Sequence, residues 1–154
     1  MSTRYLIVSD DLSGAADCAA GFAGAGLNTA VVLDVQASSS ATSAQVLTVD
    51  TDSRRDSSEQ SAAKLQRVLA AHAPGRTVLK KIDSTLRGGW ASEVATLQKA
   101  LHGIALIAPS FPAMNRVMRD GLVYVNGQRL ADTETWKLEH AHRDDRPAQM
   151  LGDA

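Results

Sequence analysis

Short apolar runs alternate with helix-patterned stretches along most of this chain, and the alternation restricts the fold more than any other feature of the sequence. Runs typical of buried strands lie at 5–8, 29–33, 46–49, 77–79 and 104–107. Stretches with helical spacing or a high alanine content lie between them, at about 15–25, 57–72 and 90–101. Alternation of this kind predicts right-handed βαβ units, which build a mainly parallel sheet with helices on both faces.

A β-hairpin is expected near the carboxyl end, after the alternating part of the chain. Two short strand-like runs at 122–125 and 128–130 are separated by Asn126-Gly127, and Asn-Gly supplies the positive φ angles of a type I′ turn. The stretch 36–44 has the composition of a surface loop, whereas 135–154 is charged and only loosely periodic. The sequence thus predicts a three-layer, Rossmann-like α/β fold with a hairpin near its carboxyl end.

The composition is that of one ordinary globular domain, because 44% of the 154 residues are apolar and can build a core. The formal net charge of -1 gives no overall field that favours nucleic acid or an anionic membrane, so any anion site must be local. The amino terminus lacks the pattern of a secretory signal, and no apolar run reaches the roughly 20 residues of a membrane span. We therefore expect a cytoplasmic protein.

The cysteine and histidine content predicts no metal centre. A single cysteine, Cys18, cannot form a disulfide within the chain. The histidines lack the paired spacing of metal ligands on a shared helix face, and we expect all of them on the surface. They are His72, His102, His140 and His142.

Polar side chains gather where three of the predicted strands end. Ser9-Asp10-Asp11 follows the first strand, 50–55 follows the third, and 80–88 follows the fourth. Because parallel strands turn their carboxyl ends to the same side, the three clusters should converge on one edge of the sheet, where open α/β sheets bind ligands. The ammonium, carboxylate, hydroxyl and guanidinium groups within 80–88 make this segment the first candidate for binding a small anionic substrate.

Four motifs, taken in order, resemble those of a known enzyme family. They are Asp10-Asp11-Leu12-Ser13-Gly14-Ala15 with Asp17, Asp50-Thr51-Asp52-Ser53-Arg54, Lys80-Lys81-Ile82-Asp83-Ser84-Thr85-Leu86-Arg87-Gly88, and Ala108-Pro109-Ser110-Phe111-Pro112 with Arg116. On these residues the chain resembles the amino-terminal domain of the four-carbon acid sugar kinases. Such enzymes use ATP to phosphorylate threonate, erythronate, 4-hydroxythreonate and related tetronates.

The resemblance implies a set of residues that contact the acid sugar. This set is Asp10, Asp11, Arg54, Lys81, Ile82, Asp83, Ser84 and Arg87. Arg54 is suited to the carboxylate of the sugar, and Asp10 and Asp83 are suited to its hydroxyl groups. Asp10, Asp11 or Asp83 can act as the catalytic carboxylate that orients the attacking hydroxyl, and the sequence does not choose among them. The chain departs from the family pattern at Ser13, Gly89 and Asn115, where Thr, Asn and Gly are usual.

The nucleotide has no recognisable binding motif in this chain. Neither Gly-x-x-x-x-Gly-Lys-Ser/Thr nor a Gly-x-Gly-x-x-Gly after a strand occurs. The resemblance implies ATP and magnesium for the complete kinase, and we expect both to bind mainly outside residues 1–154. Those residues are expected to form an incomplete substrate-binding domain without the nucleotide-binding domain, to be inactive alone, and to form homo-oligomers if apolar surface is left uncovered.

Three alternatives remain open from the residues alone. A receiver domain also has an acidic pair, a phosphoacceptor Asp and a Lys at strand ends. The corresponding residues here are Asp10, Asp11, Asp50 and Lys81. Against a receiver, Arg54 and Arg55 place positive charge in the loop that follows Asp50. Asp50-Thr51-Asp52-Ser53 approximates the motif of haloacid-dehalogenase-like phosphatases, but comes later in the chain than is usual for them. The third alternative is that the chain is a fragment that binds a tetronate without catalysis.

Overall fold

A computed structural model describes residues 3–33, 43–140 and 144–152. The loop predicted at 36–44 falls almost entirely outside these residues. The chain divides into two compact units, 1–81 and 82–154. Within the described residues, no helix combines the length and the apolar character that crossing a membrane would require.

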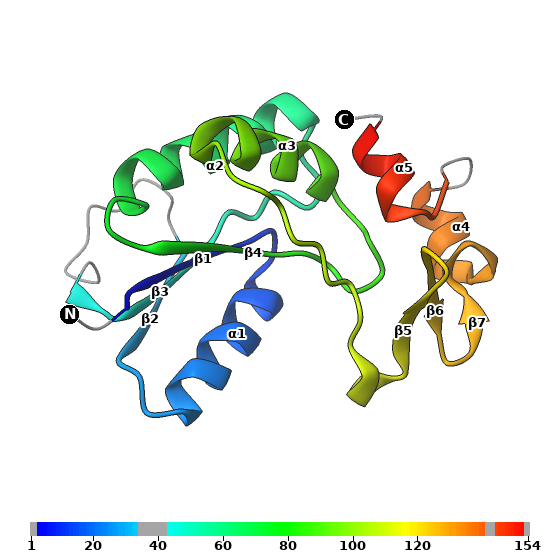
Figure 1. Ribbon diagram of the computed structural model, residues 1–154, viewed down its shortest axis with the longest axis horizontal. Helices are drawn as coiled ribbons and strands as arrows, with labels where there is room; N and C mark the ends of the chain where they lie inside the picture. Colours follow the sequence, from blue (N-terminus) through cyan, green and yellow to red (C-terminus); the bar gives the residue numbers. More distant parts are fainter. Residues whose placement is uncertain (1–2, 34–42, 141–143, 153–154) are drawn as a thin grey trace. The chain divides into compact units, whose positions relative to one another are not determined.

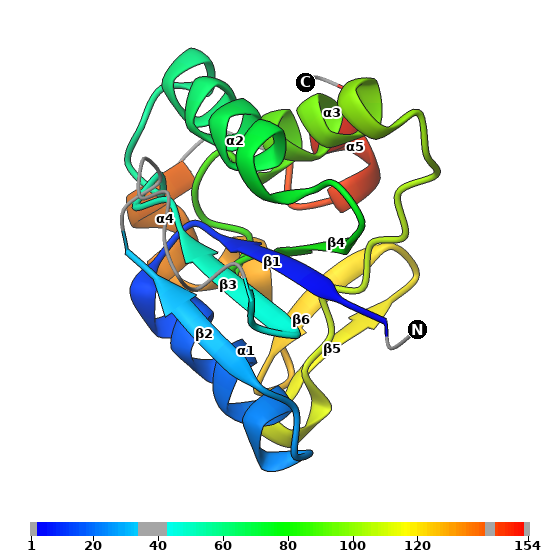
Figure 2. The ribbon, with the colours of Figure 1, turned by 90° about the vertical axis from the view of Figure 1, so that its left-hand side faces the viewer.

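Unit 1 is a parallel α/β sheet. Its elements are β1 (Tyr5–Ser9), α1 (Leu12–Gly24), β2 (Thr29–Val32), β3 (Val46–Asp50), α2 (Ser58–His72) and β4 (Thr77–Lys81). All strand pairs are parallel, and the four strands lie in the order β2-β3-β1-β4 (Figure 2). The mainly parallel sheet predicted from the alternating pattern is confirmed.

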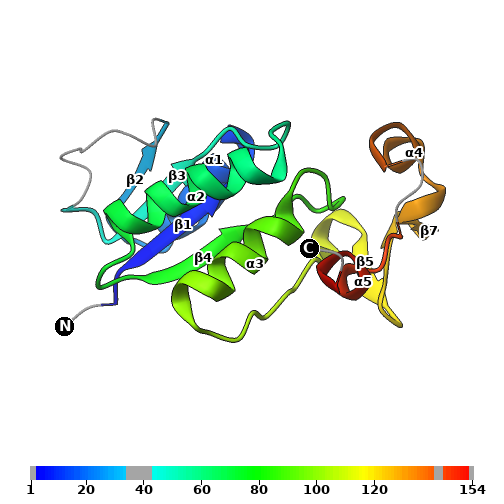
Figure 3. The same ribbon diagram turned by 90° about the horizontal axis from the view of Figure 1, so that it is seen from above.

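The two central strands form the core of unit 1 because both of their faces are covered. Every residue of β3 is buried, and β1 is buried from Leu6 onward. Helices α1 and α2 lie on opposite faces of the sheet (Figure 1), and the view from above shows α2 over β1 and β3, running roughly along these strands (Figure 3). Continuous apolar runs without polar alternation are typical of parallel strands buried on both sides.

The start of α1 depends on a residue without a side chain. Asp11 is the N-cap, and its Oδ1 accepts a hydrogen bond from the backbone N–H of Gly14 at 2.9 Å. A Cβ atom at Gly14 would lie 2.8 Å from both Asp11 Oδ1 and Ser9 Oγ, and 3.3 Å from Lys81 Cγ. Gly14 therefore leaves the space in which β1, α1 and β4 approach one another.

Unit 2 contains a small antiparallel sheet and short helices. Its elements are α3 (Trp90–Leu101), η2 (Pro112–Met114), β5 (Arg116–Arg119), β6 (Leu122–Val125), β7 (Gln128–Arg129), η3 (Leu130–Asp132), α4 (Glu134–His140) and α5 (Pro147–Gly152). The predicted hairpin is confirmed as β6 and β7, with φ angles of 51° at Asn126 and 83° at Gly127. Strand β5 was not predicted, although Asp120-Gly121 gives the same turn signal, with φ angles of 49° and 76°.

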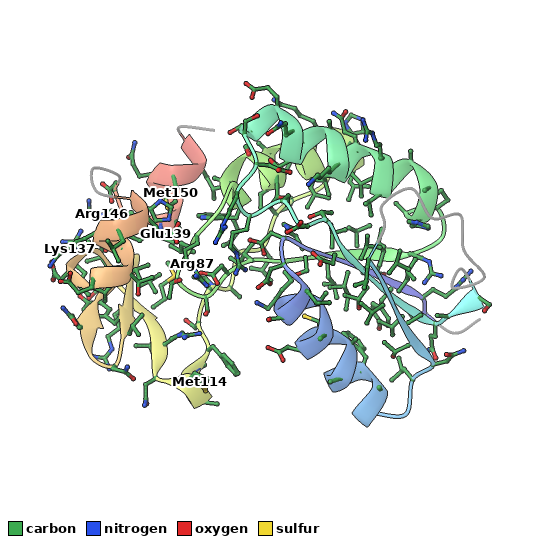
Figure 4. All side chains as sticks on the ribbon, turned by 180° about the vertical axis from the view of Figure 1, so that it is seen from behind. Arg87, Met114, Lys137, Glu139, Arg146 and Met150 are labelled. Carbon is green, nitrogen blue, oxygen red and sulfur yellow. The ribbon has the colours of Figure 1, made fainter. Side chains whose placement is uncertain are left out.

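Two tryptophans hold the core of unit 2 together. Trp90 is 1% exposed and Trp136 is 3% exposed, and both belong to a cluster of buried apolar side chains from α3, the sheet and the terminal helices. Met150, labelled in Figure 4 on α5, belongs to the same cluster. Asp145 is fully buried beside this core and accepts two hydrogen bonds from the guanidinium of Arg129, at 2.9 and 2.6 Å. This bidentate pair compensates a charge that burial would otherwise disfavour.

The prediction of a strand at 104–107 is wrong. Residues 102–110 have no regular secondary structure, and Ile104 and Leu106 are 100% and 95% exposed. Ala105 and Ile107, which alternate with them, line an apolar groove of about 290 Å³ beside α3 and α5. The segment thus has apolar side chains, but its backbone pairs with no strand in the described part of unit 2. Apolar composition cannot replace the ladder partner that a strand needs.

The prediction that all histidines lie on the surface is also wrong. His72 and His140 are 5% and 8% exposed. His72 is in the last turn of α2 and falls on its apolar face because of helical spacing. His140 contacts Trp136, one turn earlier in α4, with 4.5 Å between ring centroids. His102 is exposed as predicted, and His142 lies outside the described residues.

We expect opposite effects from two Gly→Ala substitutions in α1. Gly14→Ala should lower the free energy of unfolding by about 1–3 kcal/mol, because the added methyl group displaces Asp11 and Ser9. Gly21→Ala is the matched control, since a Cβ there would meet nothing within 4 Å. It should raise the free energy of unfolding by about 0.4–1 kcal/mol through the lower entropy of the unfolded chain. Urea unfolding of both variants measures the difference, and equal effects would contradict the close approach at Gly14.

Candidate functional site

The carboxyl ends of β1, β3 and β4 lie side by side. In the parallel register, Ser9 of β1 lies opposite Asp50 of β3 on one side and opposite Lys81 of β4 on the other. The acidic residues after β1, the loop after β3 and the lysines at the end of β4 therefore gather at one edge of the sheet. For unit 1, the convergence of polar clusters predicted from the sequence is confirmed.

Hydrogen bonds hold the loop after β3 against the end of β1. The backbone N–H and the hydroxyl of Thr51 both donate to the carbonyl oxygen of Ser9, at 2.9 and 2.8 Å. The backbone N–H groups of Ser53 and Arg54 donate to the carbonyl oxygen of Asp10, at 3.1 and 3.3 Å. These contacts fix the backbone from which the Arg54 side chain extends, so its position is set before any ligand binds.

Arg54 joins Asp10 and Asp11 through its guanidinium group. Its Nε and Nη2 donate to the two carboxylate oxygens of Asp10, at 2.9 and 3.1 Å, and its Nη1 donates to Oδ2 of Asp11 at 2.9 Å. Asp10 is 3% exposed, so its negative charge depends on this pairing for compensation. Two carboxylates around one guanidinium leave a formal excess of one negative charge. Arg54, which the sequence favoured as the partner of a substrate carboxylate, is already engaged with protein carboxylates.

Asp50 is a further buried carboxylate at this edge, with 8% of its surface exposed. Burial raises the pKa of Asp50, and the nearby charges of Asp52, Asp11 and Asp10 raise it further, against the effect of a hydrogen bond from the Asp52 N–H. That N–H donates to Asp50 Oδ1 at 2.8 Å. A carboxyl group with a raised pKa among other carboxylates is typical of functional sites.

In unit 2, Asp83 organises the segment that follows β4. Its Oδ2 accepts from the backbone N–H of Thr85 at 3.0 Å, from the Thr85 hydroxyl and from Nε of Arg87 at 2.9 Å. Its Oδ1 accepts from Nη2 of Arg87 at 2.8 Å. Arg87, labelled in Figure 4, thus forms a bidentate pair with a carboxylate that is 7% exposed. Asp83 and Arg87 therefore neutralise each other and give this segment a fixed shape.

The remaining predicted residues of this segment have different surroundings. Nη1 of Arg116, in β5, donates to the hydroxyl oxygen of Ser84. Ile82 packs against the buried core cluster of unit 2. The side chain of Ile82 is therefore part of the packing, whereas Ser84 presents a hydroxyl next to a guanidinium.

Two residues of interest were not in the predicted set. Asp50 belonged to the second family motif and to the receiver and phosphatase alternatives, but it was given no contact with the acid sugar, although its place directly before the loop of Arg54 was a usable signal. Arg116 belonged to the fourth motif without an assigned role, and only the three-dimensional structure places it beside Ser84. Among the described residues, no group of three or more His, Cys, Asp or Glu side chains is arranged to hold a metal ion.

We expect Asp50→Asn to stabilise the chain at pH 7. The raised pKa means that the folded state holds its proton above the ordinary value of 3.8, where the unfolded state has lost it. The free energy of unfolding therefore decreases as pH rises from 3.8 through the raised pKa of folded Asp50. Replacing the carboxylate by an amide prevents this decrease. The gain in melting temperature should be full at pH 7 and disappear below about pH 3.8. Asp17→Asn, at an exposed aspartate on α1, is the control. A lower melting temperature for Asp50→Asn at pH 7 would contradict the account.

Sequence relatives match most of the length of this chain. Residues 5–142 match the family described as the sugar-binding N-terminal domain. D-threonate kinases from Cupriavidus necator and Salmonella typhimurium are 46% and 33% identical to the chain, over 88% and 85% of its length. A D-erythronate kinase from Heliobacterium modesticaldum is 28% identical over 86% of the chain. The matched parts are 33%, 32% and 31% of these relatives, so the chain spans about a third of their length.

Solved structures agree with the fold. A domain of unknown function from Bordetella bronchiseptica, crystallised as a domain-swapped dimer with bound citrate, has a TM-score of 0.86 and 30% identity, and the match covers 96% of this chain and 39% of that one. A Haemophilus influenzae protein has a TM-score of 0.79 over 96% of this chain and 38% of that one, but its 18% identity shows the fold alone. From the family match over most of its length, the chain belongs to the sugar-binding N-terminal domains and is homologous to that domain of the four-carbon acid sugar kinases.

Proposed function

We propose that this chain is the acid-sugar-binding portion of an ATP-dependent kinase that phosphorylates a four-carbon sugar acid, with D-threonate as the first candidate. The relatives named D-threonate kinase, at 46%, 33% and 34% identity, support this substrate class. The citrate bound to the Bordetella relative supports it as well, because citrate is also a small hydroxylated carboxylate.

The observation that carries the proposal is the oriented pair of carboxylates at the carboxyl edge of the sheet. Arg54 holds Asp10 and Asp11 in place, and together they keep an excess of negative charge. Carboxylate oxygens accept hydrogen bonds from the hydroxyl groups of a sugar acid. Because the acceptors are ordered before binding, little entropy is lost when the ligand arrives.

We assign contacts with the acid sugar to eight residues. They are Asp10, Asp11, Arg54 and Lys81, followed by Ile82, Asp83, Ser84 and Arg87. The packing of Ile82 against the core favours a contact through its backbone. The pairing of Asp83 with Arg87 favours a role in shaping the segment, with Ser84 and the backbone as the groups offered to the ligand.

Among the three catalytic candidates, Asp11 is the best suited to orient a substrate hydroxyl. Its side chain is 27% exposed, whereas the side chains of Asp10 and Asp83 are 4% and 9% exposed. Both carboxylate oxygens of Asp83 also accept hydrogen bonds from Arg87, and Oδ2 accepts further bonds from Thr85. A carboxylate that receives the proton of an attacking hydroxyl must be within reach of that hydroxyl, which favours the most accessible group.

The nucleotide belongs to the proposal for the whole kinase. ATP and magnesium are expected to bind mainly outside residues 1–154, and phosphoryl transfer needs both for charge stabilisation. The chain alone is then expected to bind the acid sugar without turnover. The Bordetella relative is a domain-swapped dimer, which makes a homo-oligomer a reasonable form for this chain too.

The receiver-domain alternative has less support. Asp50, which would accept the phosphoryl group, is 8% exposed, and the loop that follows it is occupied by the ion pairs of Arg54. The family match lies with sugar-binding domains. Incubation with acetyl phosphate and magnesium remains a direct check, because a stable acyl phosphate on Asp50 would favour the receiver.

We expect D-threonate to raise the melting temperature of the chain. At a concentration about 100 times the dissociation constant, the linkage contribution is about 2.7 kcal/mol, which thermal denaturation detects readily. Erythronate and 4-hydroxythreonate should be measured beside it to rank the acids. Asp11→Asn should abolish or greatly reduce the shift, since it removes the charge while the amide oxygen can still cap α1.

Asp17→Asn is the matched control for this experiment. Asp17 is an exposed aspartate on the same helix, outside the proposed contacts, so its variant should keep the full shift. If none of the three acids shifts the melting temperature of the wild-type chain, the proposed function is wrong. If Asp11→Asn and Asp17→Asn both keep the shift, the acid sugar binds elsewhere.

A further inference from the structure

Arg116 differs from the other arginines of unit 2 whose contacts are described. Arg87, Arg129 and Arg146 each form an ion pair with an aspartate, at 2.8, 2.6 and 3.1 Å. Arg119 is exposed to solvent at the end of β5. Arg116 is half-buried, and among the described residues its guanidinium contacts the Ser84 hydroxyl and no carboxylate. In the described part of the chain, its positive charge therefore has no counter-charge, although its position is partly desolvated.

The backbone holds Arg116 in place. Its N–H and its carbonyl oxygen both pair with Phe111, at 3.2 and 2.7 Å, in an isolated antiparallel bridge. The preceding Asn115 has a φ of 52°, which turns the chain directly into β5. The Nε atom of Arg116 is buried and has no hydrogen-bond partner among the residues that the structure describes. A buried donor without a partner costs stability, so a fixed and incompletely satisfied guanidinium calls for an explanation beyond packing.

The neighbours of Arg116 strengthen the case for an anion. Ser84, which it contacts, directly follows Asp83, and the charge of Asp83 is taken up by Arg87. The segment 83–87 and Arg116 together thus carry one uncompensated positive charge. In unit 1, the guanidinium of Arg54 is surrounded by two carboxylates and has the opposite balance. Of the two guanidinium groups, Arg116 is the one whose electrostatics suit a free carboxylate.

We propose that Arg116 binds the carboxylate group of the acid sugar, with Ser84 holding the guanidinium in position. This inference rests on the proposed function, and it moves the carboxylate contact from Arg54 to Arg116. A planar guanidinium binds a carboxylate through parallel hydrogen bonds, a geometry that an ammonium group cannot reproduce. Arg116 is then the residue that distinguishes a sugar acid from the neutral polyol of the same length.

The test compares an acid with its neutral analogue. Calorimetry measures the binding of D-threonate and of threitol to the wild-type chain, Arg116→Gln and Arg116→Lys. Arg116→Gln should weaken D-threonate binding about 10- to 100-fold, the effect of losing a hydrogen-bonded charge contact. Threitol binding should change less than about 3-fold, because no carboxylate is present to be lost. Arg116→Lys keeps the positive charge but lacks the planar guanidinium that forms two parallel hydrogen bonds. It should show an intermediate loss of affinity for D-threonate.

Arg119→Gln is the control, because Arg119 lies on the same strand and is exposed. It should leave the affinity for both ligands unchanged, and circular dichroism of each variant checks that the fold is kept. If Arg116→Gln binds D-threonate as the wild type does, the proposal for Arg116 is overturned while the proposed function stands. The same holds if D-threonate and threitol lose affinity equally. If the wild-type chain binds no D-threonate, both proposals fail together.

Discussion

The ion pairs of Arg54 with Asp10 and Asp11 are the interaction on which the carboxyl edge of the sheet in unit 1 depends. They connect the loop after β3 to the residues between β1 and α1, and Asp11 also caps that helix. A nearly buried Asp10 without its guanidinium would leave a charge that the surrounding protein does not solvate. One arginine thus sets the position of both carboxylates, and this order exists before any ligand is present.

The charges around each arginine then indicate different roles for these similar residues. Arg54 and Arg87 are compensated by aspartates that are themselves largely buried, so their role is to hold those aspartates in a fixed geometry. Arg116 has only a hydroxyl partner among the described residues and keeps its charge available. Asp50, with its raised pKa, shows that the edge also contains a carboxylate that is unfavourable for stability. Costs of this kind are typical of binding and catalytic sites.

The sequence was sufficient to predict the elements that have a local pattern and the meeting of residues that parallel strands bring to one edge. The alternation of strands and helices, the Asn126-Gly127 hairpin and the meeting of Asp10, Asp50 and Lys81 at one edge followed from periodicity and turn chemistry. The strand at 104–107 failed, because an apolar run does not reveal whether a partner strand lies beside it. The pairing of Arg54 with Asp10, across 44 positions, depends on side-chain geometry that no spacing in the sequence encodes.

A double-mutant cycle on Arg54 and Asp10 tests the central claim most directly. The free energy of unfolding is measured by urea denaturation for the wild-type chain, Arg54→Gln, Asp10→Asn and the double variant. If Arg54 is committed to holding Asp10, the coupling energy should be about 1.5 kcal/mol or more, as for other close charge pairs. If the two substitutions are additive within about 0.5 kcal/mol, the side chains do not depend on each other, and Arg54 would be available as an independent anion-binding group.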